Sequence, residues 1–141
     1  IALYFCPQEW LEAGKLQRIV LVIMSKATSE VHERWNFNIE TDSEVVTKGV
    51  SREKSDKEII REIEAIMRQI VSCLTYLPCL DKECVFDVLA YTEKDVAVSF
   101  TWIESDAKLI QNPQMVKLHS FDTNIHIVDT LVSYKNDEWD E

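Results

Sequence analysis

The feature that most constrains the fold of this chain is a single long amphipathic segment with strand-like segments on both sides. From residue 59 onward, apolar side chains recur at three- and four-residue spacing, which predicts a helix with one wide apolar face. Ser55 and Glu58 have the spacing of a capping box at its start, and Pro78 stops it. The apolar stripe consists of Ile59, Ile60, Ile63, Ile66, Met67, Ile70, Val71, Leu74 and Leu77. A lone helix of this kind predicts a sheet that its apolar face covers.

The segments on either side of this helix have the patterns of β-strands. Residues 16–24 form an apolar, β-branched run typical of a central strand, and residues 34–40 alternate between apolar and polar side chains. These two segments are predicted to form an antiparallel hairpin, and a polar loop over 41–54 leads into the helix. Residues 85–91 and 97–102 are also strand-like, the latter around Val98, Phe100 and Trp102.

The C-terminal stretch LHSFDTNIHIVDTLVSYKNDEWDE (118–141) is long, strand-prone and acidic at its end. Its apolar positions change phase along the stretch, which predicts a bend or bulge in a long β region. Together these elements predict an α+β fold in which a long helix covers one face of an antiparallel sheet. The open question is which sheet edge the C-terminal stretch pairs with. If it pairs with one edge only, the stretch is a fixed part of the sheet. If it can pair with either of two edges, the stretch is a conformational switch.

Composition narrows the functional classes. A chain of 141 residues predicts one domain, and 25 acidic against 15 basic residues argue against binding a nucleic-acid backbone, which needs clustered Lys and Arg. The two glycines, Gly14 and Gly49, are too few for a phosphate-cradling loop, and Gly14 has the place of a helix cap. The sequence has no apolar run of membrane-spanning length and no signal-peptide pattern. We therefore expect a soluble protein of a reducing compartment, the cytosol or the nucleus.

No arrangement of cysteines, histidines or serines has the pattern of a catalytic or metal site. Cys73, Cys79 and Cys84 lack zinc-ligand spacing and are expected to be buried or half-buried free thiols. His119 and His126 would face opposite sides of a regular strand, which disfavours one zinc site. No G-x-S-x-G elbow is present. The sequence therefore predicts no catalytic residue, no bound metal and no cofactor.

Two groups of side chains leave alternatives open. Trp139, within the acidic terminus, is either frayed or docked against a partner. The other three tryptophans are expected in the core: Trp10, Trp35 and Trp102. Arg68 and Gln69 project from the polar side of the predicted helix. They belong either to a solvated face or to an interface, since arginine is enriched in interface hot spots.

The motifs of the chain, taken in order, also resemble a known family. They are RIVLVI, ERWNFNIETD, SREKSDKEI, IMRQI, TYLPCL, CVFDVLAYT and FDTNIHIVDTLVSYK. From about Trp10 to the C-terminus the chain is similar to the HORMA-domain family, in particular to its plant-type spindle-checkpoint members of the mitotic arrest deficient two group. The resemblance implies a HORMA domain with an antiparallel central sheet, a long helix and a C-terminal β segment called the safety belt.

The resemblance implies that the C-terminal stretch is a switch. In the HORMA fold the safety belt pairs with one edge of the central sheet in an open state and with the opposite edge in a closed state. The freed edge accepts a partner peptide as an added strand, and the belt wraps over it. Main-chain hydrogen bonds then supply the binding, and the belt makes release slow.

Carried over residue by residue, the resemblance assigns 84–92 to the peptide-receiving edge, 35–40 to the edge that the belt joins, and about 95–141 to the belt. The peptide-receiving residues are Cys84, Phe86, Val88, Ala90 and Thr92. The belt residues are Trp102, Phe121, Ile125, Ile127, Thr130, Val132 and Tyr134. The residues implied in pairing an open with a closed protomer are Arg68, Gln69 and Tyr76. Thr130 has the place of a phosphorylatable serine in a relative, where a phosphate would add about two negative charges to the belt.

The function that the resemblance implies is that of a non-enzymatic adaptor of the mitotic spindle checkpoint, which delays anaphase. The expected partners are a peptide of a kinetochore scaffold of the mitotic arrest deficient one type, a peptide of the anaphase-promoting-complex activator, a second copy of the chain, and a remodelling ATPase with its HORMA adaptor. Neither nucleic acid nor membrane is an expected partner. The expected locations are the nucleus, nuclear envelope, kinetochore and cytoplasm. One alternative is a HORMA adaptor in DNA repair or meiosis. Another is a thiol- or metal-dependent enzyme, a hypothesis that only the cysteines support.

The chain departs from the family pattern at its N-terminus. Residues 1–9 do not match, and the family's N-terminal strand, first helix, small hairpin and most of its second helix do not precede Trp10. The chain is therefore interpreted as a single partial HORMA domain over 1–141, and a truncated form without function is a further alternative. Because the first helix packs beside the long helix in the family, we expect exposed apolar surface, lowered stability and a tendency to associate.

Overall fold

The two segments predicted to form a hairpin are the central strands of the sheet. In the computed structural model, which describes residues 2–42, 54–99 and 101–136, β1 (Leu16–Ser25) pairs antiparallel with β2 (Val31–Thr41). β1 also pairs with β3 (Cys84–Thr92), and β2 pairs with β6 (His126–Tyr134), both antiparallel. β1 is therefore a central strand, as its apolar, β-branched sequence predicts.

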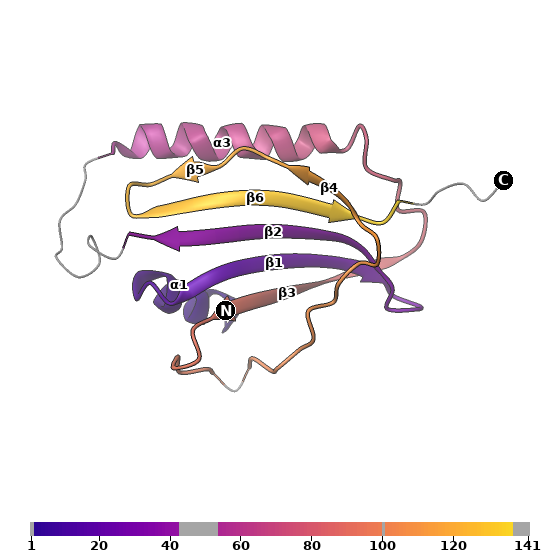
Figure 1. The fold of residues 1–141 in the computed structure, drawn as a ribbon, viewed down its shortest axis with the longest axis horizontal. Helices are drawn as coiled ribbons and strands as arrows, with labels where there is room; N and C mark the ends of the chain where they lie inside the picture. Colours follow the sequence, from indigo (N-terminus) through magenta and orange to yellow (C-terminus); the bar gives the residue numbers. More distant parts are fainter. Residues whose placement is uncertain (1, 43–53, 100, 137–141) are drawn as a thin grey trace.

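The remaining strands extend the sheet from β6. β4 (Gln114–Lys117) and β5 (Phe121–Asp122) both pair antiparallel with β6, and the strand order is β3-β1-β2-β6-β4. The C-terminal strands thus form one side of the sheet, and β3 forms the opposite edge (Figure 1).

The long β region predicted at the C-terminus is a hairpin, and its register shifts by one residue between Lys117 opposite Leu131 and Phe121 opposite Val128, at the kind of irregularity that the change of phase predicts. Between β5 and β6 the Thr123 N–H donates to the His126 carbonyl at 2.9 Å, and Asn124 has a φ of 67°. Asparagine tolerates this left-handed conformation better than most residues, so the turn forms without glycine.

The strand predicted at 97–102 is wrong, because the described residues there belong to no strand. Alternating side chains indicate two faces, but they do not supply a strand edge to pair with. Three parts of these predictions lie outside the described residues. They are Phe100, Trp139, and residues 43–53 of the predicted loop, which include Gly49.

The long helix α3 (Asp56–Cys73) begins as the capping box predicts. The Ser55 hydroxyl accepts the Glu58 N–H at 3.3 Å, and the Glu58 carboxylate accepts the Ser55 N–H at 3.3 Å. The helix ends at Cys73, so Leu74 and Leu77 of the predicted stripe lie in the turns beyond it. α3 runs along the β4–β6 side of the sheet (Figure 1).

Apolar clusters lie on both faces of the sheet. The cluster between α3 and the sheet contains Trp35, Cys73, Leu118 and Val132. The cluster on the other face contains Val20, Val22, Met24 and Leu89. The prediction that the helix covers one face of an antiparallel sheet is confirmed.

Only part of the α3 stripe is covered by the sheet. Ile66 is 5% exposed, whereas Val71 is 62% exposed. Phe86 is 71% exposed and lies opposite Ile23, so it shares the sheet face that α3 covers in part. We call this surface the open apolar face, and it comprises Ile60, Ile63, Met67, Val71, Leu74 and Phe86. The predicted exposed apolar surface is therefore present.

A short helix, α1 (Ala2–Glu12), precedes β1 and includes most of the segment that the family resemblance leaves unmatched. The Gly14 N–H donates to the Leu11 carbonyl at 3.1 Å, and Gly14 has a φ of 69°. This left-handed conformation is the one that glycine favours after a helix, so the predicted cap is confirmed. Trp10 in α1 is buried, as is Trp35, in agreement with the prediction.

Candidate functional site

The outer side of β3 is the first component of the site. Within the described residues β3 pairs with β1 alone. The Val88 N–H donates to the Asp87 carboxylate at 3.1 Å, which indicates that it points away from β1. Main-chain polar groups alternate along a strand, so those of Phe86, Val88 and Ala90 are on the outer side. These groups have the arrangement that an added strand needs.

The five predicted peptide-receiving residues lie on this strand at alternate positions: Cys84, Phe86, Val88, Ala90 and Thr92. Phe86 and Val88 lie opposite Ile23 and Leu21, which pack against the cluster under α3. The site therefore joins a strand edge to the apolar side of the sheet.

A groove with a volume of about 890 Å³ lies beside β3. Residues 87–92 of β3, Trp10 of α1, Val98 and residues 101–108 line it. A strand edge and a non-strand segment therefore both line the groove, and this combination suits an extended chain.

Two aromatic rings hold the segment after β3 to α1. The Trp10 and Trp102 rings are 5.6 Å apart between centroids and tilted by 59°, a favourable geometry for an aromatic pair. The Trp10 indole N–H donates to the Ala97 carbonyl at 3.1 Å. Further along, Lys108 lies 3.8 Å from the Asp87 carboxylate. Trp102, predicted as core, is half-buried and lines the groove.

Trp10 is a site residue that sequence reasoning missed. Its burial agrees with the expected core position, but its ring contacts Trp102 and lines the groove. No sequence signal could have shown this, because an apolar aromatic residue in an amphipathic segment does not indicate which distant segment it contacts.

Lys15 ties the start of β1 to the point where the chain leaves β3. Its ammonium lies 2.6 Å from the Glu93 carboxylate and 3.3 Å from that of Asp95. The hydrogen bond to Glu93, and then that to Asp95, raises the pKa of Lys15. The Glu93 N–H also donates to the Lys15 carbonyl at 3.1 Å. These contacts with Lys15 therefore hold the start of the predicted belt next to the start of β1.

The C-terminal strand β6 lies at the opposite side of β1–β2 from β3. Trp35 pairs with Val132 and Phe37 pairs with Thr130. This is the 35–40 edge that the resemblance assigns to the closed state. Val132 is 0% exposed and Thr130 is 1% exposed, so the pairing buries belt side chains completely. The Thr130 hydroxyl is therefore not accessible for modification in this arrangement.

The other predicted belt residues lie along the same hairpin. Phe121 is half-buried opposite Val128, and Tyr134 is half-buried opposite Glu33. Ile125 and Ile127 are 37% and 43% exposed. The belt residues thus divide into those under α3 and those near the surface at the β5–β6 turn.

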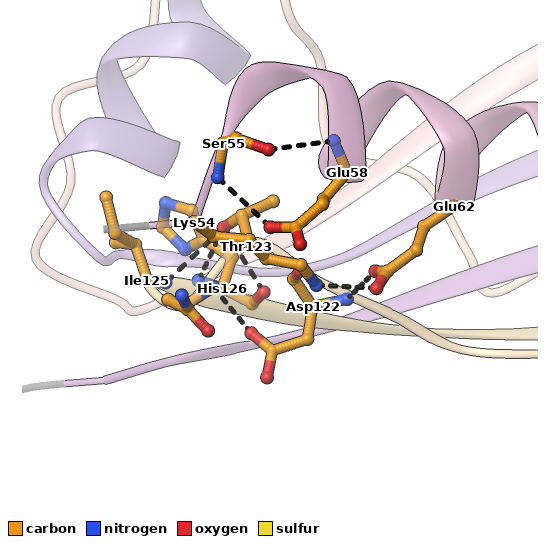
Figure 2. A network of polar contacts seen from close by, with 9 residues as sticks. Lys54, Ser55, Glu58, Glu62, Asp122, Thr123, Ile125 and His126 are labelled. Carbon is orange, nitrogen blue, oxygen red and sulfur yellow. Dashed lines mark hydrogen bonds and ion pairs between the residues drawn. The ribbon is translucent and has the colours of Figure 1, made fainter. Parts of the chain in front are cut away.

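Side chains beside and within the start of α3 bind the main chain just before the β5–β6 turn (Figure 2). The Glu62 carboxylate accepts the Asp122 N–H at 3.0 Å and lies 2.6 Å from the Lys54 ammonium. Lys54 also donates to the Asp122 carbonyl. The Lys54 hydrogen bond, and then the Asp122 N–H, lowers the pKa of Glu62, so the carboxylate stays ionised.

The three residues predicted to mediate protomer pairing are not arranged alike. The Arg68 side chain is 71% exposed, with a long ion pair of 3.9 Å to Glu64. Gln69 is turned toward the belt instead, and its side-chain oxygen accepts the His119 N–H at 2.7 Å. The Tyr76 hydroxyl donates to the Cys73 sulfur at 2.7 Å, which raises the pKa of Tyr76 to about 12. Of the two residues predicted to project from the polar side of the helix, Gln69 therefore binds a segment of the same chain.

The cysteines and histidines have ordinary environments. Cys73 is buried and Cys84 half-buried, but Cys79 is exposed, so the expectation for the thiols is wrong at that position. His119 is exposed, whereas His126 Nδ1 lies 3.0 Å from the Thr41 hydroxyl. Among residues 2–42, 54–99 and 101–136, no three His, Cys, Asp or Glu side chains gather to hold a metal ion. No helix in the described part of the chain has the length and apolar character needed to cross a bilayer.

Comparisons with known sequences identify the family to which a sheet of this strand order belongs. The HORMA domain family matches residues 8–126. The mitotic spindle checkpoint protein MAD2 of Arabidopsis thaliana is 84% identical over 94% of this chain and 64% of its own length. The MAD2A spindle assembly checkpoint protein of Homo sapiens is 43% identical over 91% of this chain and 62% of its own length. The chain thus spans slightly less than two thirds of these relatives.

Comparisons with solved structures give the same fold. A chain in the crystal structure of the mitotic checkpoint complex matches with a TM-score of 0.79 and 36% identity, over 91% of this chain and 67% of that one. C. elegans HTP-2 bound to the HIM-3 closure motif matches with a TM-score of 0.68 over 90% of this chain and 63% of that one. Its identity is 12%, so it supports the fold alone. The matching family and the strand order together show that this chain belongs to the HORMA-domain family.

Proposed function

We propose that this chain is an adaptor of the mitotic spindle checkpoint that binds an extended partner peptide along the outer side of β3. The observation that carries the proposal is the arrangement of the two sheet edges. β6 occupies the β2 side, while β3 at the other edge borders a groove that residues 101–108 help to line. A peptide in this groove would pair with β3 and lie under the segment that connects β3 with β4.

Two relatives that are 84% and 82% identical to this chain support the checkpoint as the setting, because they are named as spindle checkpoint proteins. The proposed peptides belong to a kinetochore scaffold of the mitotic arrest deficient one type and to the anaphase-promoting-complex activator. The proposed locations are the nucleus, nuclear envelope, kinetochore and cytoplasm. In this function the chain catalyses no reaction, since binding and slow release are sufficient to delay anaphase.

Self-pairing and remodelling are further parts of the proposal. The exposed Arg68 side chain is available to a second copy of the chain, whereas Gln69 contributes by holding the belt beside it. A remodelling ATPase with its HORMA adaptor would act on the pairing of β6 with β2, because this pairing has to break for a trapped peptide to leave.

The experiment that tests the proposal is co-elution of the chain with a labelled, extended, hydrophobic peptide, followed by a dilution chase. Val88→Pro removes an outward N–H without changing the ladder to β1, and we expect it to abolish trapping. Val88→Ala keeps that N–H and is expected to retain binding. Unchanged binding by Val88→Pro would contradict strand addition, and loss of binding by both variants would place recognition in the side chain.

A chain that melts cooperatively but binds no peptide would contradict the proposed function while leaving the fold intact. Binding followed by slow release would support it. The thermal melt, followed by circular dichroism, therefore accompanies the binding measurement.

A further inference from the structure

We propose that the flank of α3 acts as a substitute strand edge that fastens residues 119–122 and so holds β6 on β2. This inference deepens the proposed function, on which its consequence for peptide release rests. We call the three side chains involved the α3 clamp, and they are Lys54, Glu62 and Gln69.

The first argument is the pattern of hydrogen bonds. Gln69 accepts the His119 N–H at 2.7 Å, and Glu62 accepts the Asp122 N–H at 3.0 Å. Lys54 donates to the Asp122 carbonyl. The clamp therefore binds both main-chain polar groups of Asp122, its N–H and its carbonyl. A neighbouring strand would satisfy Asp122 in the same way, with an acceptor for its N–H and a donor for its carbonyl.

The second argument is that the spacings match. Glu62 and Gln69 are two turns apart on α3, which separates them by about 10 Å along the helix axis. His119 and Asp122 are three residues apart in an extended segment, which also separates them by about 10 Å. The helix can therefore accept both N–H groups at once without distortion of either element.

The third argument is that the clamp is partly shielded and fixed in place. The Lys54 side chain is 15% exposed, and its ion pair with Glu62 is therefore weakened by solvent less than an ordinary surface pair. Ser55 caps α3 directly after Lys54, which fixes where Lys54 lies relative to Glu62 (Figure 2). Leu118, next to the clamped segment, is 4% exposed in the cluster under α3. An apolar anchor and a polar clamp thus act on consecutive residues.

The fourth argument is that the clamp depends on one arrangement of the belt. The clamped segment follows β4 and includes β5, and both of these strands pair with β6. The Leu118 N–H also donates to the Thr130 carbonyl at 2.9 Å. If β6 leaves β2 and moves away from α3, the clamp contacts break with it. They therefore stabilise the observed pairing relative to any arrangement in which β6 lies elsewhere.

The clamp is tested by amide hydrogen exchange in the intact chain, measured by NMR at His119 and Asp122. Glu62→Ala is expected to speed exchange at Asp122 by about tenfold, because a charge-assisted hydrogen bond is lost. Glu64→Ala is the matched control, since the Glu64 side chain is on the same helix, is 58% exposed and forms a long ion pair of 3.9 Å with Arg68. It is expected to leave both amides unchanged. Unaltered exchange in β1 would show that the fold of each variant is intact.

The consequence for function is tested by the dilution chase on the same variants. Faster exchange at Asp122 together with faster peptide release in Glu62→Ala, but not in Glu64→Ala, supports the proposal. Unchanged exchange overturns it, as does equal acceleration in the control. Faster exchange with unchanged release would show that the clamp does not hold β6, and would also overturn it. If the unmodified chain traps no peptide, the proposed function fails, while the exchange comparison still decides whether the clamp fastens the segment.

Discussion

At the scale of single residues, Thr130 stands out because its hydroxyl is buried without a hydrogen bond. It is 1% exposed, and its Oγ1 has no partner in the described part of the chain. Burying an unpaired hydroxyl costs about 1–3 kcal/mol, whereas valine has the same shape and no polar group. We expect Thr130→Val to raise the free energy of unfolding by about 1 kcal/mol, measured by thermal melting.

A negative charge at the same position is expected to have the opposite effect. Thr130→Glu would bury an unpaired carboxylate between β2 and α3 and destabilise the chain by about 3 kcal/mol or more. A lower melting temperature for Thr130→Val would show instead that the hydroxyl is bonded. Modification of Thr130 would thus act on the chain only while β6 is away from β2.

His126 makes the stability of the belt depend on pH. Burial lowers the pKa of His126, so the folded state favours the neutral ring. The unfolded chain binds a proton at higher pH than the folded one, and stability is therefore lost as pH falls below about 6.5. We expect the melting temperature to fall between pH 7.5 and 5.5, and to fall less in His126→Gln. An equal fall in both proteins would assign the effect to other groups.

At the scale of elements, the pair of Trp10 and Trp102 is expected to control how firmly the segment after β3 covers the groove. Trp102→Ala removes the ring contact, and aromatic pairs contribute about 0.5–1.5 kcal/mol beyond burial. We expect peptide release in the dilution chase to become about tenfold faster. Leu109→Ala is the control, because Leu109 belongs to the same segment, is 71% exposed and does not line the groove. Equal release from both variants would contradict this role.

The elements that sequence predicts well are those with local causes. The cap at Ser55, the turn at Gly14 and the β1–β2 hairpin all follow from neighbouring residues. The strand prediction at 97–102 is wrong because alternating apolar and polar side chains do not show whether a neighbouring strand edge is available for pairing. The β5–β6 turn had one signal, Asn124, which tolerates the left-handed conformation, but its effect depends on strands that pair across it.

The site was only partly predictable. The resemblance places the predicted peptide-receiving residues on one strand, and within the described residues that strand has an unpaired outer side and borders a groove. The contacts of the clamp join residues 50 and 60 positions apart, and no periodicity within α3 distinguishes Glu62 from Glu64. Trp10 was missed for the same reason, since its contact with Trp102 depends on the path of the chain after β3.

At the scale of the whole molecule, the two exposed surfaces of α3 predict two kinds of association. Arg68→Glu is expected to weaken a discrete dimer by about tenfold, since an exposed arginine is a frequent interface anchor. Val71→Glu, on the open apolar face, is expected to reduce larger species and leave the dimer unchanged. Sedimentation velocity at several concentrations separates these species. Larger species that persist in Val71→Glu would contradict the role of the open apolar face, and an unchanged dimer in Arg68→Glu would contradict pairing through that residue.

The outer side of β3, which no other strand of the described residues pairs with, also bears on how the protein avoids aggregation. An unprotected strand edge is a template for other strands, and proteins usually protect such edges with proline, lysine or bulges. The sequence CVFDVLAYT offers only Asp87, whose carboxylate binds the Val88 N–H. Without the proposed peptide, the chain is therefore expected to add edge to edge with its own copies. The supply of ligand relative to chain would then set how much of the protein stays dispersed, so the two would have to be produced in balanced amounts.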